Sequence, residues 1–326
     1  MATSINRHAL RLAGGIALPF VVGEALGWNV PFLASIFAFQ LLAVPKPPLT
    51  LLAALITVAG LGAAFLASIL LTAIVLPHPL LFVIATGTAV FGGLYGQARN
   101  GSPFWFFLLL AVTATPVLAY QSETLATTFA GIAVRAMIVA QVTAWLMHAA
   151  FPHPGQTVPS AAPPAMDSRA AARKALFGTL IVMPLVLWLQ ANGSFAVVAV
   201  VTALTILQAS SAEGRGSSAR GLIAANVIAG AIAVAAYFVI SLAPTLAVLT
   251  VVMIAVSLTF GGRIAMRGGR APLAILACAA ALVLLGMGLT PFNDPATAFI
   301  KRLATVLLAS GYTVVGVMLL ESLQQR

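Results

Sequence analysis

Apolar stretches recur along the whole chain and are separated by short polar or Gly/Pro-containing breaks. A helix needs about 20 apolar residues to cross a hydrocarbon core of about 30 Å. Inside a membrane the backbone polar groups of such a segment must bond to one another, which favours helices. We therefore expect an all-α polytopic membrane protein with about twelve transmembrane helices, at residues 8–27, 30–44, 48–76, 79–97, 103–120, 124–151, 171–190, 195–209, 219–242, 244–260, 271–290 and 295–320.

The largest break in this pattern, residues 152–168, is rich in Pro, Ala and Ser and predicts an extended cytoplasmic linker. Six predicted spans lie on each side of it. Residues 1–151 and 169–326 are therefore predicted to be two six-helix transmembrane repeats, and an even number of spans makes them parallel. Residues that recur at a nearly constant offset support the duplication; they are Pro19 and Pro184, Phe32 and Phe195, and Arg135 and Arg302.

The composition agrees with a membrane protein, because 61% of the residues are hydrophobic and only 7% are charged. The excess of 16 Lys and Arg over 6 Asp and Glu could indicate nucleic-acid binding, but the placement of the charges argues against it. With the N-terminus in the cytoplasm, every Lys and Arg outside the membrane core falls on the cytoplasmic side, as the positive-inside rule requires. These residues are Arg7, Arg11, Lys46, Arg99, Arg169, Arg173, Lys174, Arg215, Arg220, Arg263, Arg267, Arg270 and Arg326.

Two of the predicted spans, 30–44 and 195–209, are unusually short and occupy corresponding positions in the two halves. At helical rise each is roughly 22 Å long, and such paired short segments indicate a transporter's binding site. We expect Asn29 and Ser194 to be their N-caps, with Pro31 in the first turn. Backbone N–H groups at these ends can accept a carboxylate. Alternatively, both helices simply begin at the membrane interface and tilt little.

Three cations fall inside predicted spans: Arg135, Lys301 and Arg302. A cation at the centre of a bilayer costs at least about 2.5–3.5 kcal/mol, which either an ion pair or an anionic substrate can offset. Because the chain has few acids, we favour anion handling, with Arg135 as the strongest candidate for substrate binding. Lys301 and Arg302 point about 100° apart, so one is expected to face the bundle, although both are near enough to the interface to reach the headgroups.

The acids offer two candidates for proton coupling. Glu24 lies near the external end of the first span and is either a coupling acid or a surface partner for a cation. Asp294 is the second candidate, although its position before Pro295 is typical of a helix N-cap.

No metal site, cofactor site or catalytic site is predicted. The four histidines have no metal-ligand spacing, and the single cysteine, Cys278, excludes an intrachain disulfide. No catalytic constellation is visible, so the chain is not expected to be an enzyme.

The run Trp28-Asn29-Val30-Pro31-Phe32, followed by a short helix and the basic turn Pro45-Lys46-Pro47-Pro48, resembles the opening of the fusaric-acid-resistance family of aromatic acid exporters. The second half repeats the pattern in Asn192-Gly193-Ser194-Phe195 but has Gln208-Ala209 where the family usually has Gln-Pro. Many larger members carry a soluble cytoplasmic domain after a six-helix block. Here only the linker occupies that place, so the chain is similar to a short branch without the domain.

The resemblance implies a bacterial inner-membrane exporter of aromatic or other hydrophobic carboxylic acids. It also implies a periplasmic adaptor of the membrane-fusion type as a partner. Related anion channels imply that cations on the last helix of each six-helix block line the pathway, which here means Arg135 and the Lys301-Arg302 pair.

The leading hypothesis is therefore a secondary exporter of organic anions, driven by the proton gradient and embedded in the lipid bilayer, with no nucleic-acid partner. A passive anion channel of the same fold, a non-transporting membrane scaffold and a major-facilitator transporter are the alternatives. The basic turn after the second span lacks the Gly/Asp/Arg-rich signature expected of a major-facilitator protein. The sequence leaves the substrate, the coupling ion and assembly into homo-oligomers open.

Overall fold

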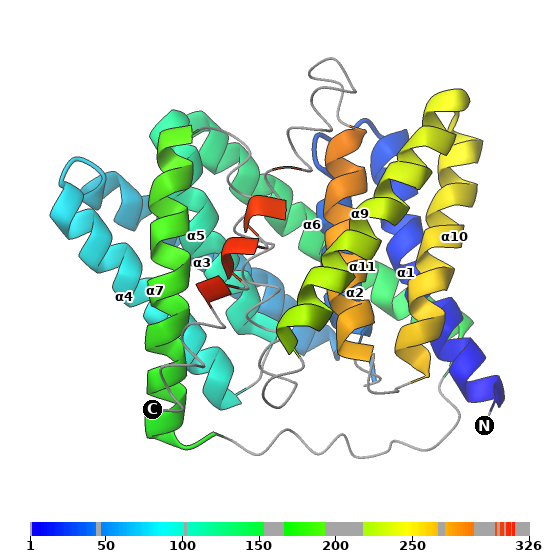
Figure 1. Cartoon of the computed structure of the whole chain (residues 1–326), viewed down its shortest axis with the longest axis horizontal. Coiled ribbons are helices and arrows are strands. Elements are labelled where there is room, and N and C mark those ends of the chain that lie inside the picture. The colour runs from blue at the N-terminus through cyan, green and yellow to red at the C-terminus, as the bar shows by residue number, and fades with distance from the viewer. Residues whose placement is uncertain are drawn as a thin grey trace. The chain divides into compact units, whose positions relative to one another are not determined.

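The computed structural model describes residues 2–43, 47–100, 103–152, 166–192, 218–266 and 271–289, with short helical pieces between 304 and 316. Within these residues every regular element is a helix and no strand occurs, so the prediction of an all-α chain is confirmed for them (Figure 1). The helices are α1 (Ala2–Ala25), α2 (Pro31–Leu42), α3 (Leu51–Val75), α4 (Pro79–Asn100), α5 (Pro103–Gln121), α6 (Glu123–Ala150), α7 (Ser168–Asn192), α9 (Ser218–Leu242), α10 (Leu246–Ala265) and α11 (Ala271–Gly288).

Each of these helices falls on a predicted span, with α1 starting six residues earlier than expected. The predicted span 195–209 lies outside the described residues, as does most of 295–320. Six helices (α3, α4, α5, α6, α7 and α10) are long and apolar enough to cross a membrane. The chain therefore has the elements of a polytopic membrane protein.

Long apolar side chains on α3 and α4 project away from the protein. Leu52 is 69% exposed, Ile74 67% and Leu80 82%. Apolar side chains exposed in such numbers indicate contact with another apolar phase. These helix faces are the ones expected to meet lipid.

The described helices form two compact units. The first unit contains α1, α2, α6 from Arg135 onward, most of α9, and α10 and α11. The second unit contains most of α3, α4, α5, α6 up to Val134, and α7. Each unit therefore combines helices from both halves of the chain.

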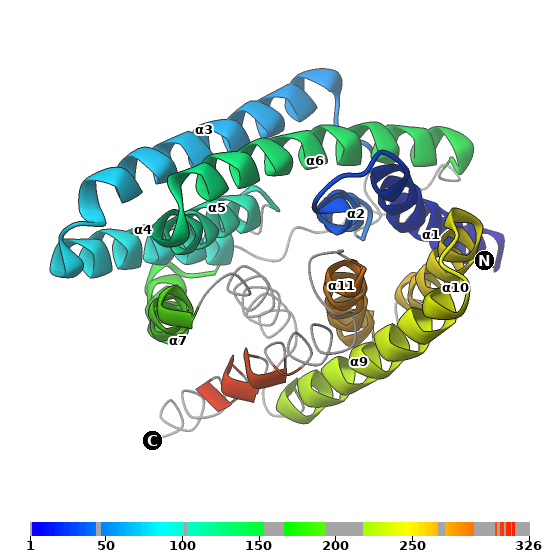
Figure 2. The same ribbon diagram turned by 90° about the horizontal axis from the view of Figure 1, so that it is seen from above.

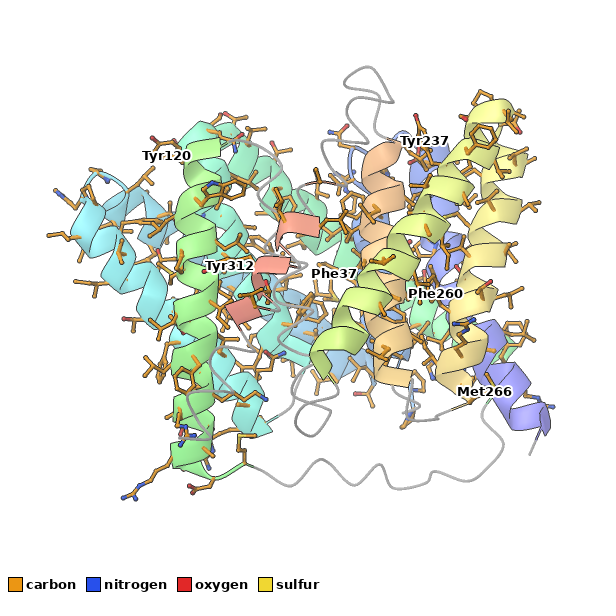
Figure 3. All side chains as sticks on the ribbon, in the orientation of Figure 1. Phe37, Tyr120, Tyr237, Phe260, Met266 and Tyr312 are labelled. Carbon is orange, nitrogen blue, oxygen red and sulfur yellow. The ribbon has the colours of Figure 1, made fainter. Side chains whose placement is uncertain are left out.

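In the first unit α1 packs against α10 and α2, and α11 packs against both α10 and α2 (Figure 2). Small residues allow the close approach: a methyl group at Gly261 of α10 would lie 3.0 Å from the carbonyl oxygen of Ala9. The hydroxyl of Ser35 on α2 donates to the carbonyl of Ile16 on α1 at 2.8 Å. Phe37 and Phe260 are among the buried aromatic side chains of this unit (Figure 3).

Among the labelled helices α2 is the shortest, with 12 residues, or about 18 Å at helical rise. Most of its side chains are buried, and only Phe32, Gln40 and Leu41 are partly exposed. A helix that is apolar on all sides is expected inside a protein. The short helix predicted near residues 30–44 is therefore present, and it lies within the first unit rather than on its surface.

In the second unit α4 packs against α7 and α5, and α5 also contacts α7. Glycines again lie at the contacts: a methyl group at Gly96 would overlap the ring of Trp105, and one at Gly178 would lie 2.7 Å from Leu94. Ser68 of α3 donates a hydrogen bond of 3.1 Å to the carbonyl of Ala111 on α5.

The two units share a packing pattern. In the first unit α1 packs against α10, which packs against α11. In the second, α7 packs against α4, which packs against α5. Each unit thus pairs the first helix of one half of the chain with the fourth helix of the other half, and that fourth helix with the fifth.

Candidate functional site

The candidate site begins with the turn that ends α1. Gly27 has a φ of +65°, a left-handed conformation that glycine adopts without strain. The Gly27 N–H donates to the Glu24 carbonyl at 3.0 Å, and the Trp28 N–H donates to the Gly23 carbonyl at 2.9 Å. These two bonds form a Schellman motif, which stops the helix and fixes the next residue. The sequence from Gly23 to Trp28 therefore sets the position of Trp28.

The indole ring of Trp28 lies between the end of α1 and the start of α2. A methyl group at Gly23 would be 3.2 Å from the ring and 2.7 Å from Pro31 Cβ, so glycine is needed for this packing. Asn29 was predicted to cap α2, but this prediction is wrong. The cap position belongs to Val30, which makes no side-chain cap bond, because Pro31 occupies the first helical position and forces the residue before it out of the helical conformation.

The strongest predicted site residue, Arg135, lies against this ring. The guanidinium carbon of Arg135 is 5.4 Å from the centre of the Trp28 ring, within the range of a cation–π contact. The Arg135 side chain is exposed in the structure. Among the described residues it makes no ion pair with a carboxylate, so its charge is not neutralised by a neighbour there.

This arrangement leaves the guanidinium able to bind a second group. A cation–π contact occupies one face of the planar group, whereas its N–H donors point outward from the edge. A carboxylate can accept two parallel hydrogen bonds from that edge. An aromatic ring on the same ligand would meet the indole nearby. The pair is therefore chemically suited to an aromatic or hydrophobic carboxylate.

Glu24 lies in the last turn of α1, four residues before Trp28, and its side chain is half-buried. Its backbone carbonyl is part of the turn that holds Trp28. Among the described residues its carboxylate makes no ion pair, so the alternative of a surface partner for a cation has no support there. Its predicted role in proton coupling stays a prediction.

The remaining predicted site residues, Ser194, Asp294, Lys301 and Arg302, lie outside the described residues. The structure therefore brings Arg135 together with Trp28. Glu24, in the last turn of α1, and Asn29, directly after Trp28, lie on either side of Trp28 in the sequence.

Sequence reasoning missed Trp28 as a site residue. The signal was present in Gly27-Trp28 directly after an apolar helix, since a glycine there is typical of a helix stop and fixes the following side chain. It also placed Arg11 with the cytoplasmic cations, whereas the structure buries this side chain to 1% exposure.

Residues 8–147 match a family model described as "Protein of unknown function (DUF2955)". The matched range begins within α1 and ends in the last turn of α6, so it contains both Trp28 and Arg135. No curated protein and no solved structure matches the chain. The matched family carries no assigned activity, so the resemblance to aromatic acid exporters stays a prediction.

Proposed function

We propose that this protein is an inner-membrane secondary exporter of organic anions, with aromatic or hydrophobic carboxylic acids as its substrates. The observation that carries the proposal is the pair formed by Arg135 and Trp28, 5.4 Å apart. In this pair an aromatic ring lies beside a cation, and the cation has no carboxylate partner among the described residues. A ligand with both a carboxylate and an apolar ring complements both groups.

The low number of acids supports the same conclusion. The chain has 16 Lys and Arg but only 6 Asp and Glu, so internal ion pairs cannot neutralise every cation. An arginine on a helix of membrane-spanning length is a functional-site hypothesis by default. A transporter or channel uses such a cation, whereas no set of side chains in the described residues points to enzymatic chemistry.

The proposed architecture has twelve spans in two parallel six-helix repeats, with both termini and the linker 152–168 in the cytoplasm. The matching helix pairs support the duplication. The contact of α1 with α10 corresponds to that of α7 with α4, and the contact of α10 with α11 corresponds to that of α4 with α5. In this arrangement the repeats exchange their third, fourth and fifth helices. Each compact unit is then built from parts of both repeats.

Coupling to the proton gradient is proposed through Glu24, with Asp294 as the second candidate. Glu24 is half-buried and belongs to the turn that positions Trp28. A change in its protonation would therefore act beside the proposed substrate site. Export across the outer membrane would use a periplasmic adaptor of the membrane-fusion type as a partner.

Flux measurements on the purified full-length protein in proteoliposomes test the proposal. Benzoate and cinnamate serve as substrates, with and without an imposed pH gradient, and cyclohexylamine serves as a cationic control. Relative to protein-free liposomes under the same pH gradient, we expect saturable flux of the carboxylates, additional accumulation against their gradient when protons flow, and no additional flux of the amine. Absence of carboxylate flux would refute the proposal.

A passive anion channel is the second candidate, and the exposed Arg135 side chain is the observation that favours it. A channel would conduct the carboxylates without accumulating them against a gradient. The same flux experiment therefore separates the two mechanisms.

A further inference from the structure

A second cation in the first unit has an unusual environment. The Arg11 side chain on α1 is only 1% exposed. Its Nε and Nη2 atoms are buried and have no hydrogen-bond partner within the described part of the chain. A buried guanidinium normally donates to carboxylate, carbonyl or phosphate oxygens, because leaving its N–H groups unbonded costs free energy.

The direction of Arg11 follows from the glycines one turn further along α1. Gly14 and Gly15 lie three and four residues after Arg11 and therefore share its face of the helix. A methyl group at Gly14 would lie 2.5 Å from the sulfur of Met147 on α6, and one at Gly15 would overlap Leu42 of α2. The face that carries Arg11 is thus covered by α2 and by the end of α6. Its side chain leans from there toward the N-terminus of α1.

No described acid is available to neutralise Arg11. In the first unit the only described carboxylate is Glu24, which lies thirteen residues away on the same helix, or roughly 20 Å along its axis. Among the described residues, the titratable side chains near Arg11 on α1 and on the packed helices α6 and α10 are all basic; they are Arg7, His8, His148 and Arg263. The local charge is therefore positive.

We propose that Arg11 is the core of an oxyanion-binding site, separate from the Arg135 site, that takes a carboxylate or a phosphate group. Two unbonded N–H donors of one guanidinium match the two oxygens of either group. The cover of α2 and α6 excludes water and strengthens the contact. The site binds its anion whether or not the protein transports it, so it does not rest on the proposed function.

The experiment measures the thermal stability of the full-length protein while an anion is titrated. The probes are benzoate and inorganic phosphate in detergent, and nanodiscs of phosphatidylcholine with or without phosphatidylglycerol. A ligand that binds only the folded state raises Tm in proportion to the logarithm of its concentration above Kd. Arg11→Gln removes the charge and keeps a polar side chain, and Arg11→Lys keeps the charge without the paired donors. Arg173→Gln removes the charge of an exposed arginine on α7, in the second unit, and is the matched control.

We expect at least one probe to raise the Tm of the wild-type protein and of Arg173→Gln. In Arg11→Gln the half-maximal concentration should rise at least tenfold, and in Arg11→Lys at least threefold. Without any anion Arg11→Gln should be as stable as the wild type or more stable, because a buried charge without a partner is removed. The response to inorganic phosphate should persist in full in Arg135→Ala, and so should the part of the benzoate response that Arg11→Gln removes, so failure of the Arg135 site leaves this result unaffected.

The probes also identify the source of the anion. A response confined to phosphatidylglycerol nanodiscs would assign a lipid headgroup, and a response to benzoate or phosphate in detergent would assign a free anion. An Arg11→Gln variant that responds like the wild type would overturn the proposal. The proposal would also be overturned if no probe raised the Tm of the wild type and Arg11→Gln had a lower Tm than the wild type. That result would assign Arg11 to an ion pair within the chain. If Arg11→Gln does not fold, the titration of Arg11→Lys decides, and an unchanged half-maximal concentration counts against the site.

Discussion

Replacement of Arg135 provides the sharpest test of the proposed substrate site. The edge of the guanidinium is expected to hold the substrate carboxylate, and hydrogen bonds to charged groups contribute about 1.5–3 kcal/mol. Arg135→Ala should therefore reduce the ratio of maximal flux to half-saturating concentration by roughly 10- to 150-fold, since about 1.4 kcal/mol is a factor of ten. Arg135→Lys keeps the charge but cannot bind both oxygens in parallel, so it should fall between the wild type and Arg135→Ala.

Trp28 should contribute less than Arg135. A cation–π contact at an exposed position is worth about 0.5–1 kcal/mol, so Trp28→Leu should reduce the same ratio roughly two- to fivefold. If the ring only orients the guanidinium, Trp28→Leu should have no further effect in the Arg135→Ala background. This double-mutant cycle separates an orienting ring from one that contacts the substrate directly.

The assay is benzoate flux into proteoliposomes that contain equal amounts of inserted protein. Arg263→Ala, which removes an exposed arginine at the end of α10, is the matched control and should transport like the wild type. Wild-type flux by a well-expressed Arg135→Ala variant would refute the reasoning and leave Arg135 as a structural residue.

Three further predictions follow from the same helices. Glu24→Gln should abolish accumulation against a gradient while benzoate binding persists, and unchanged uphill transport in proteoliposomes would remove Glu24 from the coupling step. Gly27→Ala should lower the free energy of unfolding by about 1–2 kcal/mol, because the φ of +65° at this position strains a residue with a Cβ. Gly27→Asn should be tolerated better. Equal stability of the two variants in denaturant titrations would contradict this prediction. A reporter fused at residue 160 should be active only in the cytoplasm, and periplasmic activity would invert the predicted orientation.

The positions of the described helices could be predicted from the sequence. A membrane-spanning segment must be apolar over a length that the bilayer fixes, and its polar ends mark where it leaves the lipid. These constraints act on each segment separately, so they need no knowledge of its neighbours. This is why α2, with its 12 residues, was recognised as short. The N-cap of α2 is Val30, one residue later than predicted, because Pro31 forces the residue before it out of the helical conformation.

The partners of the charged residues depended on the tertiary structure. Hydropathy shows that Arg135 lies within an apolar helix, but Trp28 comes from a turn far away in the sequence, and helix packing alone brings the two within 5.4 Å. Hydropathy placed Arg11 among the cytoplasmic cations, whereas the cover of α2 and α6 over the Gly14-Gly15 face buries it. Sequence periodicity fixes which face of a helix is apolar. It does not fix which helix covers that face, because many pairs of apolar faces are chemically equivalent and only their shapes, set here by glycines, decide between them.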